Sequence, residues 1–152
     1  MRYETLLKQT KGLPVIETEI LLAGVANPQA VRVQLSRWVK LGKIVQLKRG
    51  VYLLPETFRR EDVPVFYIAS VLQKPSYISL EKALEYYDLI PESVPVFTSV
   101  TTKRQGKFTT EAGVFDYRHV RKDLFWGYRP MTQTGKPFLW RNPKKPFWIY
   151  FI

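Results

Sequence analysis

Asn27 to Leu54, NPQAVRVQLSRWVKLGKIVQLKRGVYLL, is the stretch of sequence that decides the fold of the first part of the chain. Its first half carries the signals of a helix with defined ends. Asn27 can cap the helix, Pro28 suits the first helical position, and Gly42 can end it in the left-handed conformation. We therefore predict a helix from Pro28 to Leu41.

The predicted helix has two different faces. At about 100° per residue, Val31, Leu35 and Trp38 lie on one face, which is expected to pack in a core. The opposite face is mostly polar or basic and is expected to be free; it carries Gln29, Arg32, Val33, Ser36, Arg37 and Lys40.

The flanking segments turn this helix into a recognisable arrangement. Residues 18–23 favour a short helix, and the glycine-initiated turn of residues 24–26 leads into the longer one, which predicts a helix-turn-helix. Downstream, the β-favouring runs 44–47 and 51–54 are joined by Lys48, Arg49 and Gly50, which predicts a hairpin. A helix-turn-helix followed by such a hairpin, or wing, is the layout of a winged helix-turn-helix.

The charge of residues 27–54 favours a nucleic-acid partner. This stretch has no Asp or Glu but six cations, Arg32, Arg37, Lys40, Lys43, Lys48 and Arg49. A charge run usually does no more than solvate a helix face, yet these cations lie on the elements that would meet a duplex. We predict double-stranded DNA as the partner. The candidate contacts are Asn27, Gln29, Arg32, Val33, Ser36, Arg37, Lys40, Lys43, Lys48 and Arg49.

Composition sets wider limits. The chain has 152 residues, 45% of them hydrophobic, and a formal charge of +11, enough for one ordinary domain or two small ones. Charge is uneven: +6 over residues 27–54, −3 over 55–102 and +8 over 103–152. Cysteine is absent, and we find neither a signal peptide nor an apolar run of about 18 residues, so a cytoplasmic protein without a membrane partner is expected.

We predict two domains of overall α+β class. The first, residues 1–54, begins with a helix over residues 3–11; a proline-bounded linker covers 55–64; the second domain covers 65–152 and contains a small antiparallel sheet. Its expected elements are a helix or strand over 65–72, a helix over 80–88 with Ser79 as its N-cap, and strands over 94–102, 107–110 and 114–120.

No catalytic, metal or cofactor site is expected. The single histidine, His119, lacks companion ligands and is predicted to be surface or half-buried. Ser79 and Lys82 match a Ser-x-x-Lys pattern, but the partner motifs of the acyl enzymes are missing. Residues 134–136, Thr-Gly-Lys, lack the spaced glycine of a phosphate loop. We do not expect an enzyme.

Most of the chain resembles the N-terminal part of the AbiEi-type antitoxins. The similarity is carried by RGVY at 49–52, PSYISLEKALEY at 75–86, VFT at 96–98, Arg104 and FWGY at 125–128. The resemblance implies a winged-helix domain that binds inverted repeats in its own promoter, with a homodimer as one possibility. It also implies a C-terminal region that neutralises a nucleotidyltransferase-like toxin without needing direct contact.

The similarity ends near Leu139, where the tail WRNPKKPFWIYFI (140–152) follows neither helical nor strand periodicity. A permitted back-translation read in a shifted frame gives a sequence like the helix start that the family has at this point. This favours a chain truncated or frameshifted after about residue 139, with a tail from Trp140 that is poorly packed or held by a partner chain.

An alternative function is a protein- or RNA-interaction module in the basic second domain, which would neutralise a toxin or bind RNA. Its stacking surfaces would be Phe108, Phe125, Trp126 and Tyr128, although such aromatics are more often part of a sheet core.

Overall fold

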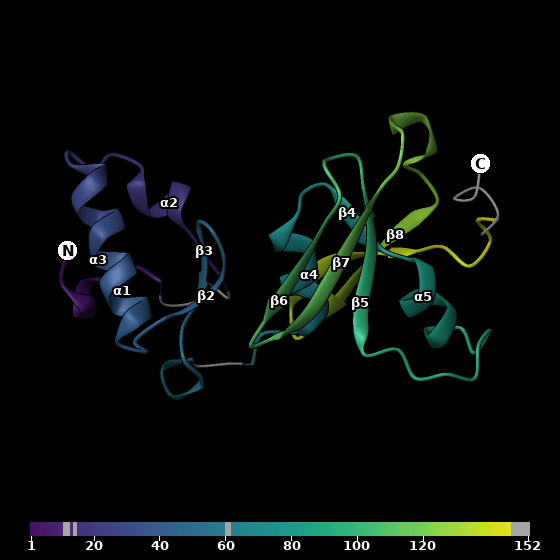
Figure 1. Cartoon of the computed structure of the whole chain (residues 1–152), viewed down its shortest axis with the longest axis horizontal. Coiled ribbons are helices and arrows are strands. Elements are labelled where there is room, and N and C mark those ends of the chain that lie inside the picture. Colours follow the sequence, from purple (N-terminus) through teal and green to yellow (C-terminus); the bar gives the residue numbers. More distant parts are fainter. Residues whose placement is uncertain (11–12, 14, 60–61, 147–152) are drawn as a thin grey trace. The chain divides into compact units, whose positions relative to one another are not determined.

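The chain forms two compact units, Met1–Val63 and Pro64–Ile152 (Figure 1). The structure is a computed structural model that describes residues 1–10, 13, 15–59 and 62–146. The architecture is α+β, as predicted from the sequence.

The first unit combines three helices with a small antiparallel sheet of strand order β1-β3-β2. Its elements are α1 (Tyr3–Gln9), β1 (Ile16–Glu17), α2 (Thr18–Leu22), α3 (Pro28–Lys40), β2 (Val45–Lys48), β3 (Val51–Leu53) and the 3-10 helix η1 (Glu56–Phe58). The three predicted helices and the predicted hairpin are confirmed to within two residues, except that Lys11, the expected end of α1, lies outside the described residues. The sequence did not predict β1, which pairs Ile16 with Tyr52.

The two ends of α3 follow from local chemistry. The Asn27 side chain accepts a hydrogen bond from Ala30 N–H (3.2 Å), which satisfies one donor of the first turn. At the other end Gly42 has φ +71°, its N–H donates to Val39 O, and Lys43 N–H donates to Trp38 O (2.9 Å). This is the Schellman arrangement, which needs a left-handed residue at the position of Gly42.

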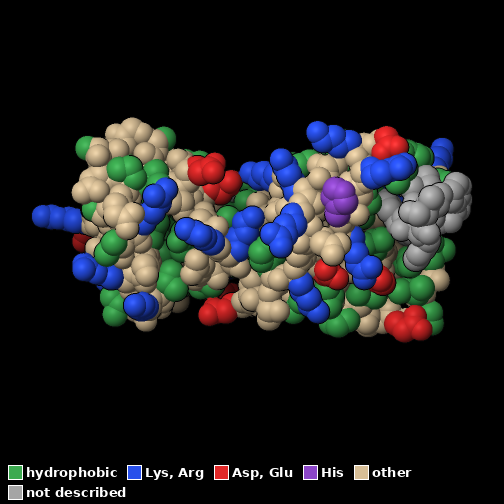
Figure 2. Space-filling view, turned by 45° about the horizontal axis from the view of Figure 1, so that its top comes forward, with side chains coloured by type: hydrophobic (Ala, Val, Ile, Leu, Met, Phe, Trp, Pro, Cys, Tyr) green, Lys and Arg blue, Asp and Glu red, His purple; other side chains and the backbone are tan. Residues whose placement is uncertain are grey.

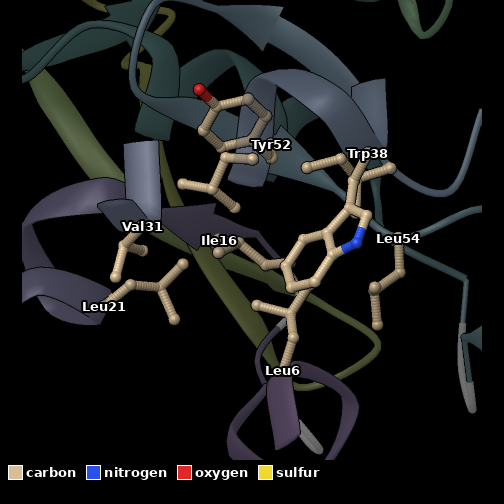
Figure 3. Packing of buried hydrophobic residues seen from close by; sticks show 9 residues of the cluster. Leu6, Ile16, Leu21, Val31, Trp38, Tyr52 and Leu54 are labelled. Carbon is tan, nitrogen blue, oxygen red and sulfur yellow. The ribbon is translucent and has the colours of Figure 1, made fainter. Parts of the chain in front are cut away.

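Apolar side chains from every helix of the first unit meet in one core (Figure 3). Val31, Leu35 and Trp38 of α3 are 5%, 0% and 3% exposed, so the predicted packing face is confirmed. The core contains Leu6, Ile16, Leu21, Val31, Leu35, Trp38, Ile44, Tyr52 and Leu54. Because α1, α2 and the sheet all pack against this face, the opposite face of α3 is fixed as the free one.

The segment after β3 is attached to the first unit. Arg59 Nε donates to Leu54 O (2.6 Å), and the Phe58 ring lies 5.9 Å from the Tyr3 ring, edge to face. The division between the units falls after Val63, whereas the sequence predicted a linker over 55–64.

The second unit is built on a six-stranded sheet of order β6-β7-β5-β4-β9-β8. Its elements are α4 (Val65–Leu72), β4 (Ser76–Ile78), α5 (Leu80–Tyr86), β5 (Val96–Thr101), β6 (Gly106–Thr110), β7 (Gly113–His119), η2 (Lys122–Leu124), β8 (Tyr128–Gln133) and β9 (Lys136–Arg141). The predicted helix 80–88 and the three predicted strands are present, and 65–72 is a helix.

The predicted antiparallel sheet is confirmed only in part: β4–β5, β6–β7 and β8–β9 pair antiparallel, but β5 pairs with β7 and β4 with β9 in parallel. The positions of β6 and β7 explain the first parallel pair. Phe115 of β7 is fully buried and stacks on Phe97 of β5 at 5.4 Å, so β7 occupies the inner position. The exposed Lys107 and Thr109 suit β6 to the edge of the sheet.

Helix α4 covers one face of this sheet. Phe66 packs edge to face on Phe97 and Trp140, and the Tyr117 hydroxyl donates to Ala69 O. On the opposite face Tyr77 and Val100 lie under the segment that contains η2, with Leu124 and Phe125 packed against them.

The start of α5 differs from the prediction. Ser79 precedes the helix but makes no side-chain capping bond. Instead, Thr98 Oγ1 of β5 accepts from Lys82 N–H (2.9 Å) and donates to Ser79 O (2.6 Å). The cap comes from a neighbouring strand, because the Ser79 hydroxyl is directed to the Arg141 guanidinium, 3.3 Å away.

The expectation of a poorly packed tail from Trp140 was wrong for Trp140, Arg141 and Lys145, whereas Pro143, Lys144 and Pro146 are exposed. Trp140 is 1% exposed, Arg141 0% and Lys145 2%. Trp140 and Arg141 end strand β9, and Arg141 Nη2 donates to Lys145 O (2.5 Å), which folds the following residues back on the sheet. Residues 147–152 lie outside the described part of the chain.

Candidate nucleic-acid interface

Helix α3 presents a polar and basic face that is open to solvent. The helix contains no acidic residue, and the six of its side chains that were predicted to contact DNA are exposed: Gln29, Arg32, Val33, Ser36, Arg37 and Lys40. Val33 is 41% exposed and therefore belongs to the open face of the helix. The structure therefore brings these six candidates together on one exposed helix face.

The hairpin of β2 and β3 is anchored through its turn. Gly50 has φ +84°, and its carbonyl accepts from both the backbone N–H (2.8 Å) and the hydroxyl (3.1 Å) of Thr18 at the start of α2. Arg49, next to Gly50, is exposed. Thr18 thus fixes the turn that carries Arg49, a role that sequence reasoning missed because the two residues lie far apart in the chain.

Lys48 differs from Arg49 in its surroundings. It is half-buried, and burial lowers the pKa of its ammonium group, while the nearby Glu17 carboxylate acts in the opposite direction. Lys48 therefore has an acidic neighbour from β1, whereas Arg49 projects from the turn.

The two remaining candidates also have structural contacts. The Lys43 ammonium lies 5.1 Å from the centre of the Tyr3 ring, and the Tyr3 hydroxyl donates to Lys43 O (2.8 Å). Lys43 is exposed, but it is directed to α1 rather than grouped with the face of α3. Asn27 is exposed, and its side-chain oxygen serves as the helix cap.

Possible catalytic groups of the second unit are engaged elsewhere. Lys82 Nζ bonds to Glu85 (3.1 Å) and to Val94 O (2.9 Å), whereas Ser79 Oγ contacts Arg141. His119 is exposed, as predicted. Within the described ranges, no group of three or more His, Asp or Glu side chains is arranged to hold a metal ion.

The four aromatics considered as stacking surfaces fall into two pairs. Phe108 and Phe125 are half-buried against Tyr117 and Tyr77. Trp126 and Tyr128 are 45% and 39% exposed, so the expectation that they belong to the sheet core was wrong.

Comparison with known proteins returned no family: neither the protein-family models nor the curated sequences compared with this chain match it. None of the described helices is both long enough and apolar enough to cross a membrane.

Proposed function

We propose that the first unit is a winged helix-turn-helix and that the chain is a DNA-binding transcriptional regulator. One observation carries the proposal: α3 buries Val31, Leu35 and Trp38 and exposes an acid-free face with Arg32, Arg37 and Lys40. In this proposal α2 and α3 form the helix-turn-helix, and the β2–β3 hairpin is the wing.

The side chains of α3 are suited both to reading base edges and to binding the phosphate backbone. Gln29 and Arg32 in its first turns have side chains that can hydrogen-bond base edges in the major groove. Arg37, Lys40 and Arg49 can bind phosphate groups. The N-terminus of α3 carries the positive end of the helix dipole and no acidic residue in its first turn, which also favours a phosphate there. A regulator of this kind would act in the cytoplasm, and inverted-repeat sites would be bound by two copies of the chain.

The test is fluorescence anisotropy with the promoter fragment upstream of the gene, at several salt concentrations. If about six phosphates are neutralised, the logarithm of affinity should fall against the logarithm of salt concentration with a slope of roughly −5. A slope shallower than about −2 would contradict the proposal.

Two variants separate base contacts from phosphate contacts. Arg32→Ala should lose about 1 to 3 kcal/mol of discrimination between the promoter and unrelated DNA, whereas Arg49→Ala should weaken both by similar factors. Lys8→Ala is the matched control, because Lys8 is an exposed cation on α1. Equal effects of Arg32→Ala and Arg49→Ala on both DNAs would refute base contact by Arg32.

We further propose, from the resemblance to the AbiEi-type antitoxins, that the chain represses its own operon and counteracts a nucleotidyltransferase-like toxin. Co-expression with the neighbouring gene tests this: growth arrest by that gene alone, relieved by this chain, is the expected result. A neighbouring gene of another class, or no rescue, would restrict the function to DNA binding.

A further inference from the structure

The second unit carries a cluster of cations that the proposed DNA-binding helix does not use. Six exposed side chains lie at the carboxyl ends of β5 and β7 and on neighbouring β6: Lys103, Arg104, Lys107, Arg118, Arg121 and Lys122. We call this set the basic rim. Its parts are held together, since Val120 N–H donates to Thr101 O (2.8 Å) and His119 Nδ1 lies 2.9 Å from Lys103 O. Figure 2 shows Lys and Arg side chains around the single histidine of this unit.

Neighbouring acidic side chains neutralise only a small part of the charge of the basic rim. Its one ion pair within the described residues joins Arg121 to Asp123 at 3.0 Å, with both side chains well exposed. Asp116 lies opposite Lys107 across the β6–β7 ladder. Two acids therefore stand against six cations, and exposed ion pairs of this kind contribute little.

Register places part of the basic rim on the same sheet face as a group of aromatic rings. Arg118 pairs with Val100, and Val100 pairs with Tyr77, so these three side chains share a face. Tyr77 packs on Phe125 at 5.1 Å on this face, opposite to α4. A hollow lies where the start of β6 meets the facing residues of β7. The hollow is lined by Gln105, Gly106, Lys107, Asp116, Tyr117 and Arg118.

Two exposed aromatic side chains follow the basic rim in the chain, and each packs against a buried residue. Trp126 is 45% exposed, and the buried Lys145 ammonium lies 4.6 Å from its ring centre while donating to its carbonyl oxygen (2.7 Å). Tyr128 is 39% exposed and packs on Tyr77 at 5.1 Å. Lys122 O accepts from Phe125 N–H, so the basic rim continues directly into this aromatic pair.

We infer that this surface binds a single-stranded nucleic acid, with phosphates on the basic rim and bases stacked on Trp126 and Tyr128. A duplex hides the faces of its bases, whereas a single strand offers them to aromatic side chains. An acidic protein, as an alternative ligand, would be bound by the cations alone and would not explain the exposed aromatic rings. The activity belongs to the second unit and does not depend on α3.

The test uses the full-length chain and a fluorescein-labelled oligouridine of about 12 nucleotides, a length within the usual range for such sites. Trp126→Ala should weaken binding roughly 5- to 100-fold, and Trp126→Phe should retain most of the affinity. Arg118→Gln combined with Lys122→Gln should make the salt slope shallower by about 1.4. Lys8→Gln, which removes an exposed cation from α1, should change neither quantity.

Paired measurements separate this inference from the proposed function. Arg32→Ala should weaken promoter DNA but not oligouridine, and Trp126→Ala should do the reverse. Loss of both ligands in Arg32→Ala would assign the strand to the first unit and overturn the inference. A Trp126→Ala variant that binds oligouridine with wild-type affinity would also overturn the inference. The surface would then attract polyanions, including acidic proteins, by charge alone. A Trp126→Ala variant that loses as much affinity for a duplex of the same length as for oligouridine would also overturn the inference. Trp126→Phe and the double variant decide the question if Trp126→Ala fails to fold.

Discussion

The two units differ in how many polar side chains they bury in their interiors. Among the described residues of the first unit, Thr10 is the one buried polar side chain, and its hydroxyl donates to Leu6 O of the helix α1 that it follows. Seven are buried in the part of the second unit that the structure describes: Ser76, Ser79, Thr98, Ser99, Thr101, Arg141 and Lys145. Most of these buried polar groups are satisfied by residues distant in the sequence, as Thr98 is by Ser79 and Thr101 by Pro75, although Ser99 Oγ has no hydrogen-bond partner among the described residues.

Two of the buried polar side chains of the second unit, Lys145 and Arg141, are cations, so they add to its net charge but not to its charged surface. Lys145 Nζ donates to Tyr77 Oη (2.9 Å), Leu124 O (2.5 Å) and Trp126 O (2.7 Å), so it joins β4 to the segment after η2. Arg141 joins β9 to Ser79 in the same way. Both count toward the +8 of residues 103–152, yet both lie inside the fold. Net charge alone therefore overstates the cationic surface of the second unit, whereas in the first unit the cations of α3 are all exposed.

The largest expected effect is on the apolar interior of the first unit. Trp38→Ala should lower the free energy of unfolding by about 3 to 5 kcal/mol, because Trp38 is 3% exposed and its loss leaves a large cavity. Denaturant unfolding measures this. Val33→Ala is the matched control on the exposed face of α3 and should change stability by no more than about 0.5 kcal/mol. Equal effects of the two substitutions would contradict the face assignment.

The second expected effect concerns the buried cation. Lys145→Ala should cost about 2 to 4 kcal/mol, since it removes the donor from the part-buried Leu124 carbonyl and the shorter of the two hydrogen bonds to Trp126 O. Lys144→Ala removes the neighbouring, exposed ammonium and should be nearly neutral. If both variants unfold at the same denaturant concentration, Lys145 does not support the second unit.

The same difference explains how much of the fold the sequence predicted. Helix α3 was located correctly because its cap, its apolar spacing and Gly42 are all local signals. Strand β4 was missed because its three residues are buried on both faces and show no alternation. Strand β9 was missed because Trp140 and Arg141 are buried with the help of distant partners, such as Ser79 and Tyr87, which lie 62 and 54 positions from Arg141.

The candidate interface was predictable to a similar degree. Helical periodicity identified the exposed face of α3, because position on a helix follows from spacing alone. It did not identify the differing surroundings of Lys48 and Arg49, which depend on Glu17 and Thr18. Likewise, composition indicated a basic second domain, but strand register was needed to group Arg118 with the aromatic face.

A smaller effect compares a local helix cap with a distant one. Asn27→Ala removes the cap of α3 and should cost about 1 kcal/mol, as is usual for such caps. Thr98→Val removes the hydroxyl that caps α5 from strand β5, and also its bond to Ser79 O, so it should cost more, about 1 to 3 kcal/mol. Denaturant unfolding of each variant gives both values. A Thr98→Val cost below that of Asn27→Ala would show that the distant cap is dispensable.

The smallest effect is a pH dependence of the second unit through Glu85. The hydrogen bond from Lys82 and, next, that from Val94 N–H hold the pKa of this carboxyl below its ordinary value, while burial opposes them slightly. Since the folded pKa is the lower one, the stabilisation is complete above the unfolded pKa and is lost as pH falls through the folded pKa. Glu85→Gln keeps an oxygen acceptor but does not titrate. We therefore expect the wild-type chain to lose slightly more stability than Glu85→Gln between neutral and acidic pH in denaturant unfolding. Identical losses would show that the negative charge of Glu85 adds nothing to the stability of the second unit.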